Sequence, residues 1–158
     1  MTDRYSVGDQ MTLVRTFDAP RQLVFDCFTN PAHMARWWGP RRFTAPVCEL
    51  DARPGGQIMV HMAGPEPYGV NPMGGEFIEV SPPERLVFSS QAYQGADGEW
   101  RIDNLNELDF AEQDGKTVLT LVVTVRKVSA ETLQALGGMR EGWSQSFDKL
   151  AELLPDLA

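Results

Sequence analysis

Positive charge, cysteine and histidine are all scarce in this chain of 158 residues. Its 14 Lys and Arg face 22 Asp and Glu, which gives a formal net charge of -8. Nucleic acids and anionic membrane surfaces are bound through clustered basic side chains, so we expect neither as a partner. The chain has no zinc-ligand spacing, no phosphate-binding glycine loop and no Gly-x-Ser-x-Gly nucleophile motif. We therefore expect no metal and no cofactor.

Long apolar runs are missing as well. No segment approaches the roughly 18 consecutive apolar residues of a membrane-spanning helix, so we expect no membrane insertion. Residues Met1–Ser6 lack the basic and apolar pattern of a secretory signal. Cys27 and Cys48 are isolated, which is typical of small buried apolar positions in a reducing compartment. The sequence thus predicts a cytoplasmic protein.

The length bounds the architecture. Domains commonly span about 100–200 residues, so the chain is expected to form a single domain over residues 1–158. A chain of this size buries roughly 70% of the surface that its unfolded form exposes, which is enough for a core without disulfides. Residues 1–10 are polar, and we expect them to be a loose N-terminal segment.

Most of the chain alternates apolar and polar residues with a period of two, which indicates β-strands. Turn sequences rich in Gly, Pro and Asp separate the segments, and such short links join antiparallel strands. The stretch Gly64–Gly75 is expected to be a long loop or a lid. The predicted strands are Met11–Phe17, Phe43–Leu50, Gln57–Met62, Gly75–Val80, Arg85–Tyr93, Ile102–Glu112 and Lys116–Lys127.

Helical periodicity occurs in two regions. Pro20 and Asn30-Pro31 each precede apolar residues at helical spacing, which predicts two short helices at about 20–28 and 31–37. A long helical pattern begins near Ser129, with a break expected at Gly137-Gly138. Its apolar stripe consists of Leu133, Leu136, Met139, Trp143, Phe147, Leu150 and Leu154. The elements predict an α+β fold with about seven antiparallel strands around a long C-terminal helix.

Five segments together resemble one family. They are Phe17–Phe25, Asn30–Pro40, Asp51–Gly56, Phe77–Phe88 and Met139–Leu153. With them the chain resembles the START-like (SRPBCC) superfamily, and within it the C-terminal domain of the activator of the 90-kDa heat-shock protein ATPase. The resemblance implies a helix-grip fold, in which a bent sheet grips the C-terminal helix. It does not specify a reaction, because members bind lipids, sterols, hormones or polyketides, or act as cyclases or co-chaperones.

The helix-grip fold implies an elongated, mostly apolar cavity between the long helix and the sheet. Ligand cavities are commonly about 300 Å³ or larger, and we expect an enclosed cavity of at least that size. For each predicted lining residue the alternative, and the commoner outcome, is that it fills a closed core. The predicted ligand-binding residues are Met34, Trp37, Ile58, Val60, Met62, Phe77, Glu79, Phe88, Asn106, Met139, Trp143 and Phe147.

Few polar residues are candidates for chemistry. Strict alternation puts Glu79 on the same face as Phe77, whereas the opposite register turns Ile78 and Val80 inward and leaves Glu79 in solvent. His61 alternates with apolar neighbours and is expected to point outward. Glu79 and His61 are the only, weak, candidates for an acid or base, so no catalytic residue is assigned.

Two asparagines share a face with apolar residues of one predicted strand. Asn104 and Asn106 have the same parity as Leu108 and Phe110. On the inner face they could bind a ligand by hydrogen bonds, but solvation at a strand end is the commoner outcome for such residues. We therefore expect the second arrangement for Asn104, whereas Asn106 stays among the predicted ligand-binding residues.

The leading functional prediction is a cytoplasmic binding module for a small, largely apolar molecule. The resemblance provides two alternatives: a chaperone-associated, ATPase-activator-like interaction domain with a role in stress response, and a polyketide-cyclase- or hydratase-like enzyme. It also allows a homodimer and a chaperone as partners. These classes differ in what they need, since a binder needs a cavity and an enzyme needs a polar group inside it.

Overall fold

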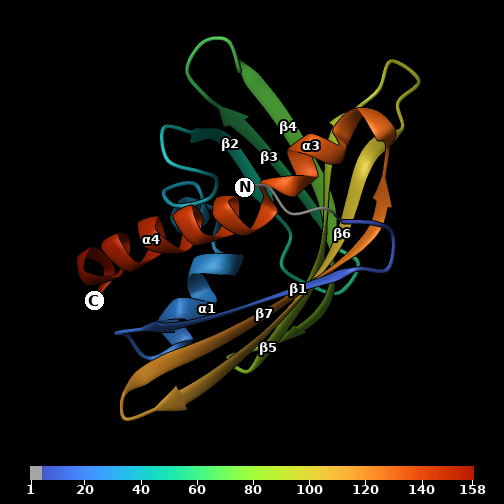
Figure 1. The fold of residues 1–158 in the computed structure, drawn as a ribbon. Coiled ribbons are helices and arrows are strands. Elements are labelled where there is room, and N and C mark those ends of the chain that lie inside the picture. The colour runs from blue at the N-terminus through green and yellow to red at the C-terminus, as the bar shows by residue number, and fades with distance from the viewer. Residues whose placement is uncertain (1–4) are drawn as a thin grey trace.

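The fold is an antiparallel sheet wrapped around one side of a C-terminal helix, as the computed structural model of residues 5–158 shows (Figure 1). The strand order is β1-β7-β6-β5-β4-β3-β2, so every hairpin pairs and β1 closes beside β7. The strands are β1 (Gln10–Phe17), β2 (Thr44–Leu50), β3 (Gln57–Ala63), β4 (Val70–Ser81), β5 (Arg85–Gln94), β6 (Trp100–Gln113) and β7 (Lys116–Val128). The predicted α+β helix-grip arrangement is confirmed.

The first two helices begin close to where the sequence places their signals. The first two, α1 (Arg21–Thr29) and α2 (Pro31–Met34), are joined by Asn30, whose side chain accepts a hydrogen bond from the Ala32 N–H at 2.9 Å. This N-cap satisfies a backbone donor that the first helical turn leaves free. The second helix is shorter than predicted, because tight turns replace it before Trp37.

The C-terminal helical region is broken at the predicted glycine pair. A short 3-10 turn η1 (Ala130–Thr132) leads into α3 (Leu133–Gly137), and α4 (Met139–Leu157) follows Gly138. The apolar stripe of α4 packs on the sheet, but Leu133 is 48% exposed. It lies at the start of α3, before the break, where Leu136 of the predicted stripe is buried but Leu133 is not.

Strand β4 is longer than predicted. It begins at Val70 rather than at residue 75, so half of the expected loop or lid is paired with β3, and Pro72 lies opposite His61. Prolines and glycines hide the alternation in this segment. Gly75 is required by packing, since a Cβ there would lie 2.0 Å from the Ser89 carbonyl oxygen.

A β-bulge in β4 changes which residues face the core. Phe77 pairs with Phe88, but Glu79 pairs with Val87, so Ile78 is the extra residue. A bulge breaks strict alternation by placing two residues opposite one. Phe77 therefore faces inward and Ile78 and Glu79 face outward, while Val80 packs against the core. The structure matches the second register expected from the sequence for Glu79 and Val80 but not for Ile78, which the bulge turns outward.

The core is dense beneath the two short helices. The Trp37 indole is fully buried, its N–H donates to the Cys27 carbonyl oxygen at 2.9 Å, and its ring meets Phe28 edge-on with centroids 4.7 Å apart. Burial raises the pKa of the Cys27 thiol to about 12. These residues are therefore structural, as their position between α1, α2 and the sheet requires.

The N-terminal segment is held against the sheet as far as the structure describes it. Tyr5 is buried, and the Gly8 N–H donates to the Val125 carbonyl oxygen at 2.8 Å. The first four residues of the segment that we expected to be loose lie outside the described residues. Within residues 5–158, no helix is both long enough and apolar enough to span a membrane.

Candidate ligand-binding cavity

A cavity of about 180 Å³ lies between the first turns of α4 and the inner face of β3 to β6, and it opens to solvent. The N-terminal end of α4 crosses the sheet here without filling the space beneath it, because Gly142 presents no side chain. The cavity is smaller than the roughly 300 Å³ that we expected for a ligand-binding pocket. It therefore suits a ligand of about one ring.

Two tryptophans and three methionines are among the residues that line the cavity. Trp38 and Trp143 meet edge to face, with ring centroids 5.1 Å apart and planes at 86°. Met62, Met73 and Met139 line the same space. Methionine thioethers are flexible and make favourable contacts with aromatic rings, so this wall can adapt to a flat apolar ligand.

Two polar side chains from paired strands face the cavity. Asn104 of β6 lies directly opposite Ser90 of β5, and both line the cavity. Asn104 is only 8% exposed; its side-chain N–H₂ contacts the Met139 sulfur at 3.7 Å, and its Oδ1 has no hydrogen-bond partner among residues 5–158. A buried carbonyl oxygen without a partner costs about 1–3 kcal/mol. Asn104 thus brings an unpaired acceptor to the cavity wall.

Asn106 of β6 is hydrogen-bonded to one member of this polar pair, Ser90. Its N–H₂ donates to the Phe88 carbonyl oxygen at 3.2 Å and to the Ser90 hydroxyl oxygen at 3.0 Å. Ser90 therefore accepts from Asn106, which leaves its own O–H free to donate. The Oδ1 of Asn106 is also unpaired among the residues that the structure describes.

A turn that lines the cavity is fixed to α4. Gly39 and Pro40 line the cavity, and Lys149 donates to the carbonyl oxygens of Gly39 and Phe43, both at 3.2 Å. Burial, aided by the nearby Arg41, lowers the pKa of the Lys149 ammonium. Arg41 is also ion-paired with Glu152 on α4. These charge-assisted contacts thus hold residues 39–43 against α4.

The predicted ligand-binding residues divide between the cavity and the core. Met62, Met139 and Trp143 line the cavity. Asn106 lies behind Ser90 and is fully buried. The space around Met34, Ile58, Phe77 and Phe88 has no room for a water molecule, and Trp37, Val60 and Phe147 are fully buried core residues. For these seven, the structure matches the closed-core alternative.

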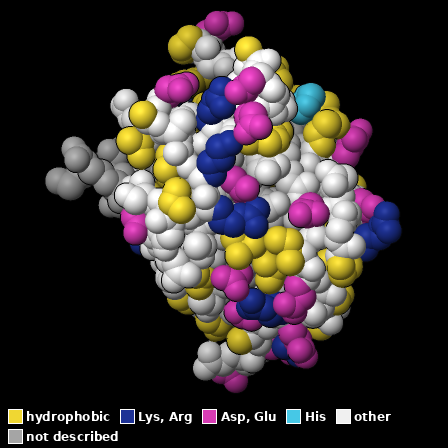
Figure 2. Space-filling view, turned by 90° about the vertical axis from the view of Figure 1, so that its right-hand side faces the viewer, with side chains coloured by type: hydrophobic (Ala, Val, Ile, Leu, Met, Phe, Trp, Pro, Cys, Tyr) yellow, Lys and Arg dark blue, Asp and Glu magenta, His cyan; other side chains and the backbone are white. Residues whose placement is uncertain are grey.

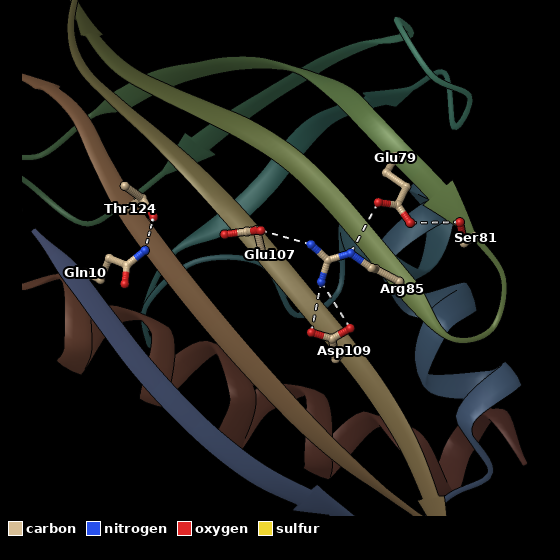
Figure 3. Close-up of polar contacts among 7 residues, drawn as sticks. All are labelled: Gln10, Glu79, Ser81, Arg85, Glu107, Asp109 and Thr124. Atoms are coloured by element: carbon tan, nitrogen blue, oxygen red, sulfur yellow. Dashed lines mark hydrogen bonds and ion pairs between the residues drawn. The ribbon is translucent and has the colours of Figure 1, made fainter. Parts of the chain in front are cut away.

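Glu79 lies on the other face of the sheet, contrary to the expectation that placed it with Phe77. Its carboxylate accepts from Arg85 at 3.2 Å and from the Ser81 hydroxyl at 3.0 Å (Figure 3). Arg85 also binds Glu107 at 2.9 Å and Asp109 at 3.0 Å. Glu79 is therefore part of an outer ion-pair network. His61 also points away from the cavity, as predicted, since Val60 and Met62 occupy the inner face.

Sequence reasoning missed several lining residues. Trp38 was overlooked because Trp37 and Trp38 both fit the helical spacing, and only the tight turns after α2 distinguish them. Met73 lay in the expected loop. Asn104 and Ser90 face inward, so the expectation that Asn104 is solvated at a strand end is wrong. The shared parity of Asn104 with Leu108 was the signal that could have found it.

Solved structures share this architecture over nearly the whole chain. Protein Ms6760 from Mycobacterium smegmatis is 29% identical, with a TM-score of 0.75 over 92% of this chain and 90% of that one. Protein CV1439 from Chromobacterium violaceum is 24% identical, with a TM-score of 0.78 over 92% and 96%. The AHSA1 protein from Silicibacter pomeroyi is 22% identical, with a TM-score of 0.74 over 95% and 100%. A comparison with curated proteins gives no match.

The fold and the cavity define a helix-grip protein of the START-like class. Within that class, the model of one family matches residues 18–155, and its description is Activator of Hsp90 ATPase homolog 1-like protein. The chain belongs to this family, which confirms the resemblance drawn from its five segments. Membership defines the fold but leaves the ligand and the activity open.

Proposed function

We propose that this protein is a cytoplasmic binding module for a small, largely apolar molecule, held between α4 and the inner face of the sheet. The observation that carries the proposal is the 180 Å³ cavity with a wall of tryptophan and methionine side chains. Apolar surface of this kind is costly to leave in contact with water, and a ligand removes that cost. The free thiols of Cys27 and Cys48 support a reducing compartment.

The proposal is tested by thermal unfolding and calorimetry with toluene as the probe. A ligand at ten times its Kd stabilises the folded state by about 1.4 kcal/mol, which raises Tm by roughly 3–6 °C in a chain of this size. Toluene is expected to do so for the wild-type protein. No shift and no heat at the solubility limit of toluene would overturn the proposal.

Two alanine variants provide a matched control. Ala92 lines the cavity, so Ala92→Leu fills it and should abolish the toluene effect. Ala151 is exposed on α4, so Ala151→Leu adds the same atoms outside the cavity and should leave the effect unchanged. Equal loss in both variants would show that toluene binds elsewhere.

A second candidate function is stimulation of a chaperone ATPase. The observation that favours it is the family match, whose description names an activator of the Hsp90 ATPase. On the face shown in Figure 2, acidic and basic side chains are interspersed, which is a surface that can form polar contacts with a partner. The test is the ATPase rate of a purified Hsp90 with and without the protein. A rate unchanged at micromolar excess contradicts this candidate.

A further inference from the structure

The polar pair on the cavity wall defines the kind of ligand more narrowly. From it we infer that the cavity selects a small, neutral aromatic alcohol of about the size of phenol, whose hydroxyl group is held jointly by Asn104 and Ser90. The inference rests on the proposed function, because it concerns the same cavity, but it adds a ligand class and two specificity-determining residues.

Size sets the first limit. An engineered cavity of about 150 Å³ in another protein stays dry and binds benzene. At about 180 Å³ the present cavity holds one ring and a small substituent. Two tryptophans and three methionines line it, and these side chains make edge-to-face and sulfur–aromatic contacts with a ring. An aromatic ring is therefore the body that fits best.

The hydrogen-bonding pattern sets the second limit. Asn104 presents an oxygen that only accepts, and Ser90 presents a hydroxyl that can donate because its oxygen already accepts from Asn106. Ser90 and Asn104 are directly opposite on antiparallel strands, where Cβ atoms are about 4.5–5.5 Å apart, so one ligand atom can form hydrogen bonds with both side chains. A hydroxyl both donates and accepts, and so it satisfies the pair with a single atom. An ether or a methyl group leaves Asn104 unpaired.

Charge sets the third limit. None of the described residues that line the cavity is acidic, basic or a histidine. A carboxylate or ammonium group buried there would lose its hydration without gaining a counter-charge, which is strongly unfavourable. The Asn104 oxygen would in addition repel a carboxylate. The ligand is therefore neutral at pH 7.

The experiment measures the Kd of phenol, toluene and benzoate by calorimetry for the wild-type protein and for Asn104→Leu, Ser90→Ala and Thr120→Val. The ratio of the toluene Kd to the phenol Kd should be at least about tenfold larger in the wild-type protein than in Asn104→Leu, since one buried hydrogen bond distinguishes the two ligands. Comparing ratios cancels the different hydration of the two probes. Ser90→Ala should lower the ratio in the same direction.

Thr120→Val is the matched control. Thr120 lies on β7 between Leu119 and Leu121, whose side chains are fully buried on the inner face, so the hydroxyl that this variant removes lies on the other face of the sheet. Its ratio should equal that of the wild-type protein. Benzoate should bind the wild-type protein at least about tenfold more weakly than phenol does.

The outcomes separate the inference from the proposed function. If toluene binds but the ratio is the same in the wild-type protein, Asn104→Leu and Ser90→Ala, the inference fails and the binding function stands. Benzoate binding as tightly as phenol also overturns the inference. If none of the three probes binds the wild-type protein, the proposed function itself fails. Wild-type phenol, toluene and benzoate affinities need no variant, so misfolding of one variant does not remove the test.

Discussion

Replacing Gly142 by alanine should make the protein more stable and a poorer binder at the same time. Gly142 lies in the first turns of α4 and lines the cavity, and a Cβ built on it meets no atom closer than Pro40 Cγ at 4.0 Å. The methyl group therefore enters open space without a clash. Glycine inside a helix is less stable than alanine by about 0.5–1 kcal/mol. Gly142→Ala should thus raise Tm by roughly 1–4 °C.

The same methyl group takes space from the ligand. One methylene too many in an apolar pocket costs a ligand about 1–3 kcal/mol, so the affinity for toluene should fall by about 5- to 150-fold. Urea unfolding gives the stability change, and calorimetry gives the affinity. Ala151→Gly, on the exposed side of the same helix, is the control and should lower stability with unchanged affinity. A Gly142→Ala variant that is more stable but binds toluene as before would refute the position assigned to the ligand.

Four further predictions follow from residues outside the cavity. Burial raises the pKa of the Cys27 thiol from 9.0 to about 12 and that of the Cys48 thiol from 9.0 to about 11. Because only the thiolate reacts, the thiols of the native protein at pH 8 should react with a disulfide reagent at least about 100-fold more slowly than those of the urea-unfolded chain. Stability should fall as pH rises from about 9 to 12, because unfolding then releases the thiol protons; a flat stability profile contradicts this. Trp37→Phe leaves the buried Cys27 carbonyl oxygen unpaired and creates a void, so it should lower the free energy of unfolding by about 2–4 kcal/mol, measured in urea. A loss of less than about 1 kcal/mol would show that the indole contributes little to the core. Arg85→Gln removes three half-exposed ion pairs, which should cost about 1–2 kcal/mol and less in 1 M NaCl; a cost independent of salt argues against an electrostatic origin.

Local signals in the sequence were sufficient for the order and type of the elements. Asn30-Pro31 begins a helix because both residues act within one turn, and Gly137-Gly138 breaks one for the same reason. The period-two segments became seven strands in the expected order. These features depend on neighbours a few residues apart, which a single sequence displays directly.

Features that depend on distant strands could not be predicted in the same way. The bulge at Ile78 is set by how β4 pairs with β5, and it reverses the face of Glu79. Whether an apolar residue fills the core or lines a cavity depends on the side chains that pack against it from other elements. Phe77 and Met62 therefore have the same apolar pattern in the sequence, but Phe77 lies in the closed core and Met62 lines the cavity. Asn104 illustrates the same limit for a polar side chain.

The most direct test of the ligand cavity is a crystal structure of the wild-type protein soaked with bromobenzene and recorded at the bromine absorption edge. We expect one anomalous peak inside the cavity, next to Trp38 and Trp143 and close to Gly142 of α4. The same soak of Ala92→Leu should show no peak there. Bromine density confined to the outer surface in the wild-type crystal, with an empty cavity, would contradict the account.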